Sequence, residues 1–152
     1  METSEGVQTI VHFASRNGHI LVPVILNGST SARVLLDTGS QITVVSQQLA
    51  RSLNLPSVRN RYVRLQTIAA DVQAPLARLD SIEIAGLSRE NFQVAVADLA
   101  IGGSQEFDGI LGMDFLQAYA IQIDNSRNRI ILSPLTQEVA DLSHLFRRQT
   151  NC

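Results

Sequence analysis

The residue in this sequence with the clearest capacity for chemistry is Asp37, because it ends the apolar segment ARVLLD (32–37) and leads directly into Thr38-Gly39-Ser40. Glycine at position 39 lets the chain turn sharply and lets backbone amides approach the carboxylate closely. Thr38 and Ser40 add hydroxyl groups within reach of that turn. A carboxylate at the end of a buried strand is costly unless it is paired or functional. Asp37 is therefore either a functional acid or an Asx-type turn residue that only accepts backbone hydrogen bonds.

A second motif, Ile110-Leu111-Gly112, follows Asp108-Gly109 and precedes a segment with the length of one or two helical turns. A strand that ends in glycine can pass closely behind another loop, since glycine has no Cβ. We therefore expect this strand to lie behind the turn that carries Asp37. Asp108 is expected in a turn before the strand, and Asp114 is expected to cap the helix at its N-terminus. Neither is expected to be catalytic.

Mainly β-strands are expected to position these motifs, since short runs rich in Val, Ile and Leu alternate with Gly, Asn, Ser and Pro. Asn17-Gly18 is the strongest hairpin signal, and Ser46 can cap a short helix that ends before Pro56. Two strands, 61–68 and 75–86, flank a polar tip at 69–74 and form a long hairpin able to close over a cleft. The other expected strands cover 7–14, 19–26, 32–37, 41–46, 91–99 and 107–112, and a last hairpin joins 120–124 to 129–134.

The length of 152 residues fits a single domain. We divide the chain into an N-terminal segment with the first strand (1–17), the main domain (18–134) and a helical or flexible C-terminal tail (135–152). The tail is interpreted as helical because its apolar residues recur at helical spacing. These are Val139, Leu142, Leu145 and Phe146.

Composition excludes several classes of function. The formal net charge of -2 gives no electrostatic footprint for nucleic acid. The sequence contains no lysine, which excludes a P-loop and Schiff-base chemistry. With one cysteine, Cys152, and three scattered histidines, neither a disulfide framework nor a metal site is expected, and no cofactor is expected.

No signal peptide or membrane-spanning run is found. The sequence therefore indicates a soluble domain, and it does not identify the compartment. Membrane association is expected only if an anchor lies outside this chain.

The order of three features resembles the single-domain, retroviral-type (retropepsin-like) aspartic peptidases over roughly residues 18–134. The features are Leu35-Leu36-Asp37-Thr38-Gly39-Ser40, the hairpin around Ala70, and Ile110-Leu111-Gly112. The final hairpin, 120–134, is more similar to the bacterial and DNA-damage-inducible-protein members than to the viral enzymes. The resemblance implies a mainly β, single-lobe acid-protease fold. We expect a closed β-barrel with one short helix after the strand 110–112.

The resemblance also implies roles for individual residues. Asp37 matches the catalytic aspartate, Thr38 the threonine whose hydroxyl reaches across the dimer axis, and Gly39 the glycine whose carbonyl side faces bound peptide. Residues 67–75 match the flap, and residues 110–112 support the active-site loop. The flap residues expected to bind substrate are Thr67, Ile68, Ala69, Ala70, Asp71 and Val72, and the candidate pocket walls are Ile42, Val72 and Ile110.

One Asp-Thr-Gly supplies half of an aspartic peptidase site, so the resemblance implies a homodimer with Asp37 and its symmetry mate at a twofold axis. Two carboxylates about 3 Å apart cannot both ionise cheaply, so the pair holds one proton over an acidic range. We expect an aspartic endopeptidase with an acidic pH optimum that acts on peptide or protein. We also expect the Ser40 hydroxyl to donate to Asp37. The alternative is a catalytically weak or inactive dimerisation or peptide-binding module.

Departures from the viral pattern affect the expected dimer and flap. Viral enzymes pair an Asp and an Arg at the positions of Gln41 and Met113, so the dimer is expected to rely on other contacts, chiefly the hairpin 120–134. Viral flaps are rich in glycine, whereas residues 67–75 contain none and include Pro75. We therefore expect a stiffer and shorter flap that either leaves the cleft more open or closes more slowly.

Overall fold

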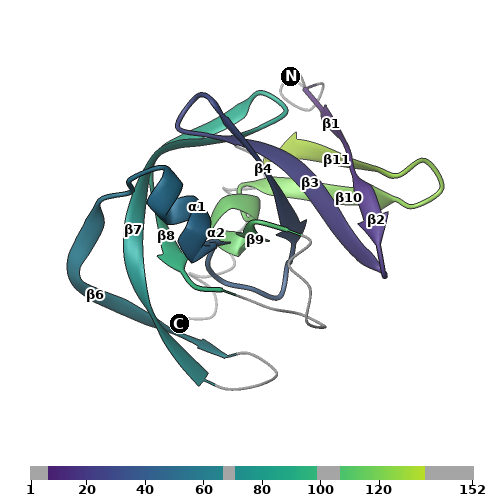
Figure 1. Ribbon diagram of the computed structural model, residues 1–152. Helices are drawn as coiled ribbons and strands as arrows, with labels where there is room; N and C mark the ends of the chain where they lie inside the picture. Colours follow the sequence, from purple (N-terminus) through teal and green to yellow (C-terminus); the bar gives the residue numbers. More distant parts are fainter. Residues whose placement is uncertain (1–6, 67–70, 99–106, 136–152) are drawn as a thin grey trace, which may run out of the picture.

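The computed structural model describes residues 7–66, 71–98 and 107–135, which form a mainly β fold with two short helices (Figure 1). The strands are β1 (Thr9–His12), β2 (Ala14–Arg16), β3 (His19–Leu26), β4 (Thr30–Leu36), β5 (Val44–Val45), β6 (Ser57–Gln66), β7 (Asp71–Ile84), β8 (Leu87–Val96), β9 (Gly109–Leu111), β10 (Tyr119–Asp124) and β11 (Arg129–Pro134). The helices are α1 (Gln47–Ser52) and α2 (Met113–Leu116). The predicted fold class is confirmed, including the short helix after the strand at 110–112.

Eight strands form one sheet in the order β2-β3-β4-β9-β5-β8-β7-β6. Strand β3 also pairs with β7, through Ile25 with Glu83 and Leu26 with Ile82, so the sheet returns onto itself. Only these two residue pairs join β3 to β7, so the sheet is barrel-like without being strictly closed. The prediction of a closed barrel is corrected to this extent. Strands β1, β11 and β10 form a separate sheet in that order, seen at the right of Figure 1.

Two groups of buried side chains hold these sheets together. The larger group surrounds Phe115, whose ring packs edge-on against Phe92 at 6.1 Å and stacks on Tyr119 at 5.9 Å between ring centroids. The smaller group includes Leu35 from β4 and Ile110 from β9. Full burial of one such apolar side chain contributes about 1.5–3 kcal/mol. Packing therefore fixes the two strands that carry the sequence motifs.

The turn signal at Asn17-Gly18 and the cap signal at Ser46 are confirmed. Asn17 and Gly18 both adopt positive φ angles, 52° and 81°, and join β2 to β3 with Arg16 opposite His19. This is the combination that a tight two-residue hairpin requires. Ser46 caps α1, where its hydroxyl accepts a hydrogen bond from the Leu49 backbone nitrogen at 3.1 Å.

Strands β6, β7 and β8 begin before the predicted strands 61–68, 75–86 and 91–99, and two further expected strands, 7–14 and 41–46, are divided or shortened. The segment 7–14 is divided at Phe13, whose side chain is buried and whose backbone nitrogen donates to the Asn128 carbonyl at 3.0 Å. This contact separates β1, which pairs with β11, from β2, which pairs with β3. The segment 41–46 contributes only the two residues of β5. Just before them, the Thr43 carbonyl accepts from Ala95 of β8, but the Thr43 backbone nitrogen donates to the Asp114 carboxylate in α2 and not to a strand.

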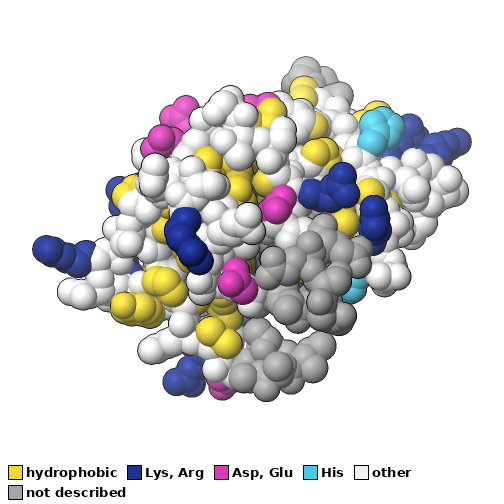
Figure 2. Space-filling view, viewed as in Figure 1, with side chains coloured by type: hydrophobic (Ala, Val, Ile, Leu, Met, Phe, Trp, Pro, Cys, Tyr) yellow, Lys and Arg dark blue, Asp and Glu magenta, His cyan; other side chains and the backbone are white. Residues whose placement is uncertain are grey.

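Within the described ranges, no helix is long and apolar enough to cross a membrane. On the face shown in Figure 2, basic and acidic side chains are interspersed and not gathered by sign. The predicted helix in the tail lies outside the described residues.

Candidate active site

Strands β4 and β9 bring the two sequence motifs together. They run parallel, with Leu35 opposite Ile110 and Leu36 opposite Leu111. Immediately after these pairs, the Asp37 backbone nitrogen donates to the Leu111 carbonyl oxygen at 3.1 Å. The loop that carries Asp37 therefore begins at a point fixed by the second motif.

The turn after β4 holds the Asp37 carboxylate at the surface. The Gly39 backbone nitrogen donates to Asp37 Oδ1 at 2.9 Å, and the Ser40 nitrogen donates to the Asp37 carbonyl at 3.1 Å. Asp37 is partly exposed, and Thr38 and Gly39 are exposed. Among the described residues, Asp37 Oδ2 has no hydrogen-bond partner. The turn thus has Asx geometry and uses only one of the two carboxylate oxygens for contacts within residues 7–66, 71–98 and 107–135.

The prediction that the Ser40 hydroxyl donates to Asp37 is wrong. Ser40 Oγ donates to the Ile42 carbonyl at 2.8 Å. A hydroxyl has a single proton, so this bond leaves none for Asp37. The Gly39 amide occupies the position next to the carboxylate instead. Ser40 therefore closes the loop on its own chain.

Gly112 lies directly behind the Asp37 loop. A Cβ at this position would stand 2.7 Å from the Ile42 carbonyl oxygen and 2.9 Å from the Ser40 carbonyl oxygen. Met113, the next residue, donates its backbone nitrogen to the Ser40 carbonyl at 2.8 Å. Only a residue without a side chain allows this close approach, which is the role anticipated for the apolar-apolar-Gly strand.

Thr43 and Asp114 join the two motifs and were not recognised as site residues from the sequence. Thr43 donates its backbone nitrogen to Asp114 Oδ2 at 2.9 Å and its hydroxyl to Asp114 Oδ1 at 2.7 Å. The Gly112 backbone nitrogen donates to Thr43 Oγ1 at 3.1 Å. We call these three hydrogen bonds the Thr43–Asp114 clamp. The sequence signal that could have indicated it is a threonine inside the otherwise apolar stretch ITVV (42–45).

The predicted N-cap role of Asp114 is therefore corrected. Gly112 occupies the N-cap position of α2, and no side chain caps the helix there. Asp114 lies within the first turn, where its Oδ1 also accepts from the Phe115 backbone nitrogen at 2.9 Å. A carboxylate in the first turn is favoured by the free backbone N–H groups of the helix.

Asp108 lies in a bend before β9 and connects it to β4. Its backbone nitrogen donates to the Arg33 carbonyl at 2.7 Å, and its Oδ2 accepts from the Arg33 backbone nitrogen at 3.0 Å. The Asp108 carbonyl also accepts from the Ser46 nitrogen at 2.9 Å. Its carboxylate is thus used in a structural link between elements.

In the hairpin of β6 and β7, which was predicted as the flap, strand pairing extends further than expected. Gln66 pairs with Asp71 and Leu65 with Val72, so the predicted tip residues Asp71–Ala74 belong to β7. Cross-strand pairing with β6 prevails here over the weak strand preference of Asp and Gln. The flap residues Thr67, Ile68, Ala69 and Ala70 lie outside the described residues.

The candidate pocket walls divide into two kinds. Ile110 is buried in the smaller core group, and Ile42 packs against that group while partly exposed. Val72 on β7 is 39% exposed. In the described part of the chain, no group of three or more His, Cys, Asp and Glu side chains is arranged to hold a metal ion.

Comparison with known proteins gives a consistent result. The family model described as "Aspartyl protease" matches residues 22–115. A retropepsin-like aspartic protease from Rickettsia conorii is similar in structure, with a TM-score of 0.61 and 22% identity over 83% of this chain and 89% of that chain. EIAV protease complexed with the inhibitor HBY-793 has a TM-score of 0.50 and 24% identity over 68% of this chain and 92% of that chain. The comparison with curated proteins found no match. The two solved structures show that the fold is retropepsin-like.

Proposed function

The chain belongs to the aspartyl protease family, and on that premise we propose that it is an aspartic endopeptidase that hydrolyses peptide bonds as a homodimer. The observation that carries the proposal is the Asp37 turn. One carboxylate oxygen is held by the Gly39 amide at 2.9 Å, and the other has no partner among the described residues. Asp37 thus has a fixed orientation and an oxygen that remains available.

The proposed chemistry uses two copies of Asp37. A water molecule lies between the carboxylates, one of which is ionised and the other protonated. The ionised carboxylate takes a proton from the water as the water oxygen attacks the peptide carbonyl carbon. The other donates its proton to the carbonyl oxygen. Collapse of the tetrahedral intermediate breaks the C–N bond. The amine leaves with the proton that the first carboxylate took from the water, and one hydroxyl of the intermediate returns its proton to the second carboxylate. No metal or cofactor takes part.

An acidic pH optimum follows from the shared proton. Two adjacent carboxylates cannot both be charged without strong repulsion, so the working pair carries a single negative charge. As pH rises, loss of the shared proton removes the general acid and cleavage slows. As pH falls, protonation of both carboxylates removes the general base.

Substrate is proposed to bind as an extended strand between the flap and the active-site floor. Strands β6 and β7 form the arms of the flap and pair as far as Gln66 and Asp71. Among the candidate pocket walls, Ile42 is partly exposed and Val72 is 39% exposed, so both offer apolar surface, whereas Ile110 is buried. These features favour an unfolded or extended peptide segment with apolar side chains.

The test is cleavage of casein from about pH 3 to about pH 8, comparing the wild-type protein with Asp37→Asn. Asp37→Asn is expected to reduce cleavage at least about 1,000-fold without loss of fold, because an amide cannot exchange the catalytic proton. Asp80→Asn, which changes an exposed carboxylate on β7, is the matched control and should retain full activity. Inhibition by a statine-type compound should follow the same pH range.

A peptide-binding module without catalysis gives a different result. In that case the wild-type protein and Asp37→Asn bind an extended peptide equally, and neither cleaves it at any pH. A folded wild-type dimer with no cleavage of casein or of a peptide library would contradict the proposed function.

A further inference from the structure

We propose that Thr43 and Asp114 are positioning residues for catalysis: their clamp sets the position of the Asp37 loop relative to β9 and α2. This inference rests on the proposed function for its kinetic consequence. Its structural basis is independent, because the hydrogen bonds are present in the single chain. Neither side chain is proposed to touch substrate.

The first step is the burial of Thr43. It is 1% exposed and is the one polar residue in the buried set of the described chain. Its two donors, the backbone nitrogen and the hydroxyl, are both used on the Asp114 carboxylate, at 2.9 Å and 2.7 Å. Hydrogen bonds to a charged acceptor are roughly twice as strong as those between neutral groups. The bond pair therefore fixes both the backbone and the rotamer of Thr43.

The second step concerns which hydrogen bond the Thr43 hydroxyl donates and which it accepts. Because Thr43 Oγ1 gives its proton to Asp114, its lone pairs face the other way and accept from the Gly112 backbone nitrogen at 3.1 Å. The Gly112 N–H can only donate, so Asp114 supports this bond by orienting the Thr43 hydroxyl with a lone pair toward Gly112. Asparagine at position 114 offers a single acceptor oxygen and presents N–H donors where Thr43 also donates.

The third step connects Gly112 to the Asp37 loop. On one side of Gly112, the Leu111 carbonyl accepts from the Asp37 nitrogen at 3.1 Å. On the other side, the Met113 nitrogen donates to the Ser40 carbonyl at 2.8 Å. The start and the end of the catalytic turn are therefore bonded to the two residues that flank Gly112. A shift of Gly112 changes the position of both.

The kinetic test compares Thr43→Val, Thr43→Ser and Asp114→Asn on a fluorogenic peptide built from a mapped casein cleavage site. Thr43→Val and Asp114→Asn are expected to lower kcat about 10- to 100-fold with KM nearly unchanged, because the defect is in the placement of Asp37 and not in substrate contact. Thr43→Ser keeps the hydroxyl and should retain kcat close to the wild-type value. Asp98→Asn is the matched control. Its carboxylate also bridges distant segments, with Oδ1 accepting from the Gln47 nitrogen at 3.0 Å, but it has no bond to the Asp37 loop.

Amide hydrogen exchange measured by NMR provides a readout that does not depend on catalysis. In Thr43→Val and Asp114→Asn, the amides of Asp37, Ser40 and Met113 should exchange at least about 10-fold faster than in Thr43→Ser, while amides of β3 and β7 stay unchanged. If Thr43→Val fails to fold, Asp114→Asn and Thr43→Ser carry the comparison.

The inference and the proposed function fail in distinguishable ways. Inactive wild-type protein overturns the proposed function, and the exchange rates then decide the inference alone. Wild-type kcat in Asp114→Asn, an equal loss in Thr43→Ser and Thr43→Val, or unchanged exchange at Asp37 overturns the positioning role.

Discussion

Position 112 requires glycine for steric reasons and not because of an unusual backbone angle. Its φ of -105° is open to any residue. The atoms that a Cβ would meet within 3.0 Å are all backbone atoms, namely the Ile42 carbonyl carbon and oxygen and the Ser40 carbonyl oxygen. Backbone atoms cannot rotate aside as a flexible side chain can. A side chain at position 112 would therefore displace the loop that follows Asp37.

Gly112→Ala is expected to destabilise the protein by about 1–3 kcal/mol through overpacking and to lower kcat. Urea unfolding and peptide cleavage measure the two effects. Gly86→Ala is the control, because Gly86 has a φ of +91° and no atom within 4 Å of a built Cβ. Gly86→Ala should cost about 1–2 kcal/mol through backbone strain alone and leave kcat unchanged. Wild-type kcat in Gly112→Ala would show that the close approach does not position the loop.

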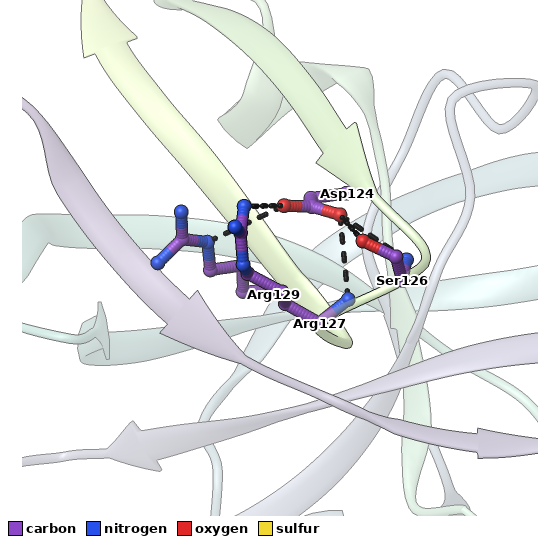
Figure 3. A network of polar contacts seen from close by, with 4 residues as sticks. All are labelled: Asp124, Ser126, Arg127 and Arg129. Atoms are coloured by element: carbon purple, nitrogen blue, oxygen red, sulfur yellow. Dashed lines mark hydrogen bonds and ion pairs between the residues drawn. The ribbon is translucent and has the colours of Figure 1, made fainter.

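The hairpin of β10 and β11 is closed by a polar network at its turn (Figure 3). Asp124 accepts from the Ser126 hydroxyl at 2.7 Å and from Arg127 Nη1 at 3.2 Å, and it forms an ion pair with Arg129 at 3.6 Å. The hydrogen bond from the Ser126 hydroxyl lowers the pKa of Asp124 below its ordinary value, and Arg127 lowers it further. Desolvation acts in the opposite direction and is outweighed. The network therefore stabilises the ionised carboxylate.

This lowered pKa predicts how the hairpin responds to acid. Because the pKa of Asp124 is lower in the folded state, its stabilising contribution is present above the unfolded value near 3.8 and is lost as pH falls through the folded value. Asp124→Asn should therefore lower the free energy of unfolding at neutral pH, and its difference from wild type should shrink below pH 3.8. Urea unfolding over that range tests this, with Asp80→Asn as the control. A difference that is constant with pH would contradict it.

A single chain presents surfaces that are suited to a second copy. Thr38 and Gly39 are exposed beside Asp37. Strands β1 and β10 are the edges of the three-stranded sheet, and each carries an exposed apolar side chain, Ile10 at 47% and Ile123 at 43%. Exposed edge strands with apolar side chains favour association with another chain. They agree with the expectation that the hairpin 120–134 contributes to the dimer.

Dimerisation predicts that activity depends on protein concentration and on subunit mixing. Specific activity should rise with concentration until the dimer is saturated. Excess Asp37→Asn protein should inhibit the wild-type enzyme, because mixed dimers contain only one Asp37 carboxylate. Asp37→Asn protein that is denatured beforehand serves as the control for crowding and substrate competition. Specific activity that is independent of concentration, together with no effect of mixing, would contradict a shared site at the twofold axis.

The sequence by itself determined the features whose cause is local. The turn at Asn17-Gly18 and the Ser46 cap could be predicted because nearby residues restrict the backbone there. The same holds for Asp37, since a carboxylate followed by Thr38-Gly39 at a strand end forms its turn with its own neighbours. The order of the motifs along the chain then indicated the family resemblance, and the resemblance implied the fold.

Only the tertiary structure decided the partners of side chains whose contacts come from distant parts of the chain. Asp114 resembles a helix cap in sequence, yet it bonds Thr43, 71 residues away. The Ser40 hydroxyl could reach either Asp37 or its own loop, and in the folded chain it donates to the Ile42 carbonyl, which packs against Gly112. Phe13 divides one apolar run between two sheets because its amide meets Asn128. In each case several local geometries are close in energy, and packing between distant segments selects one of them.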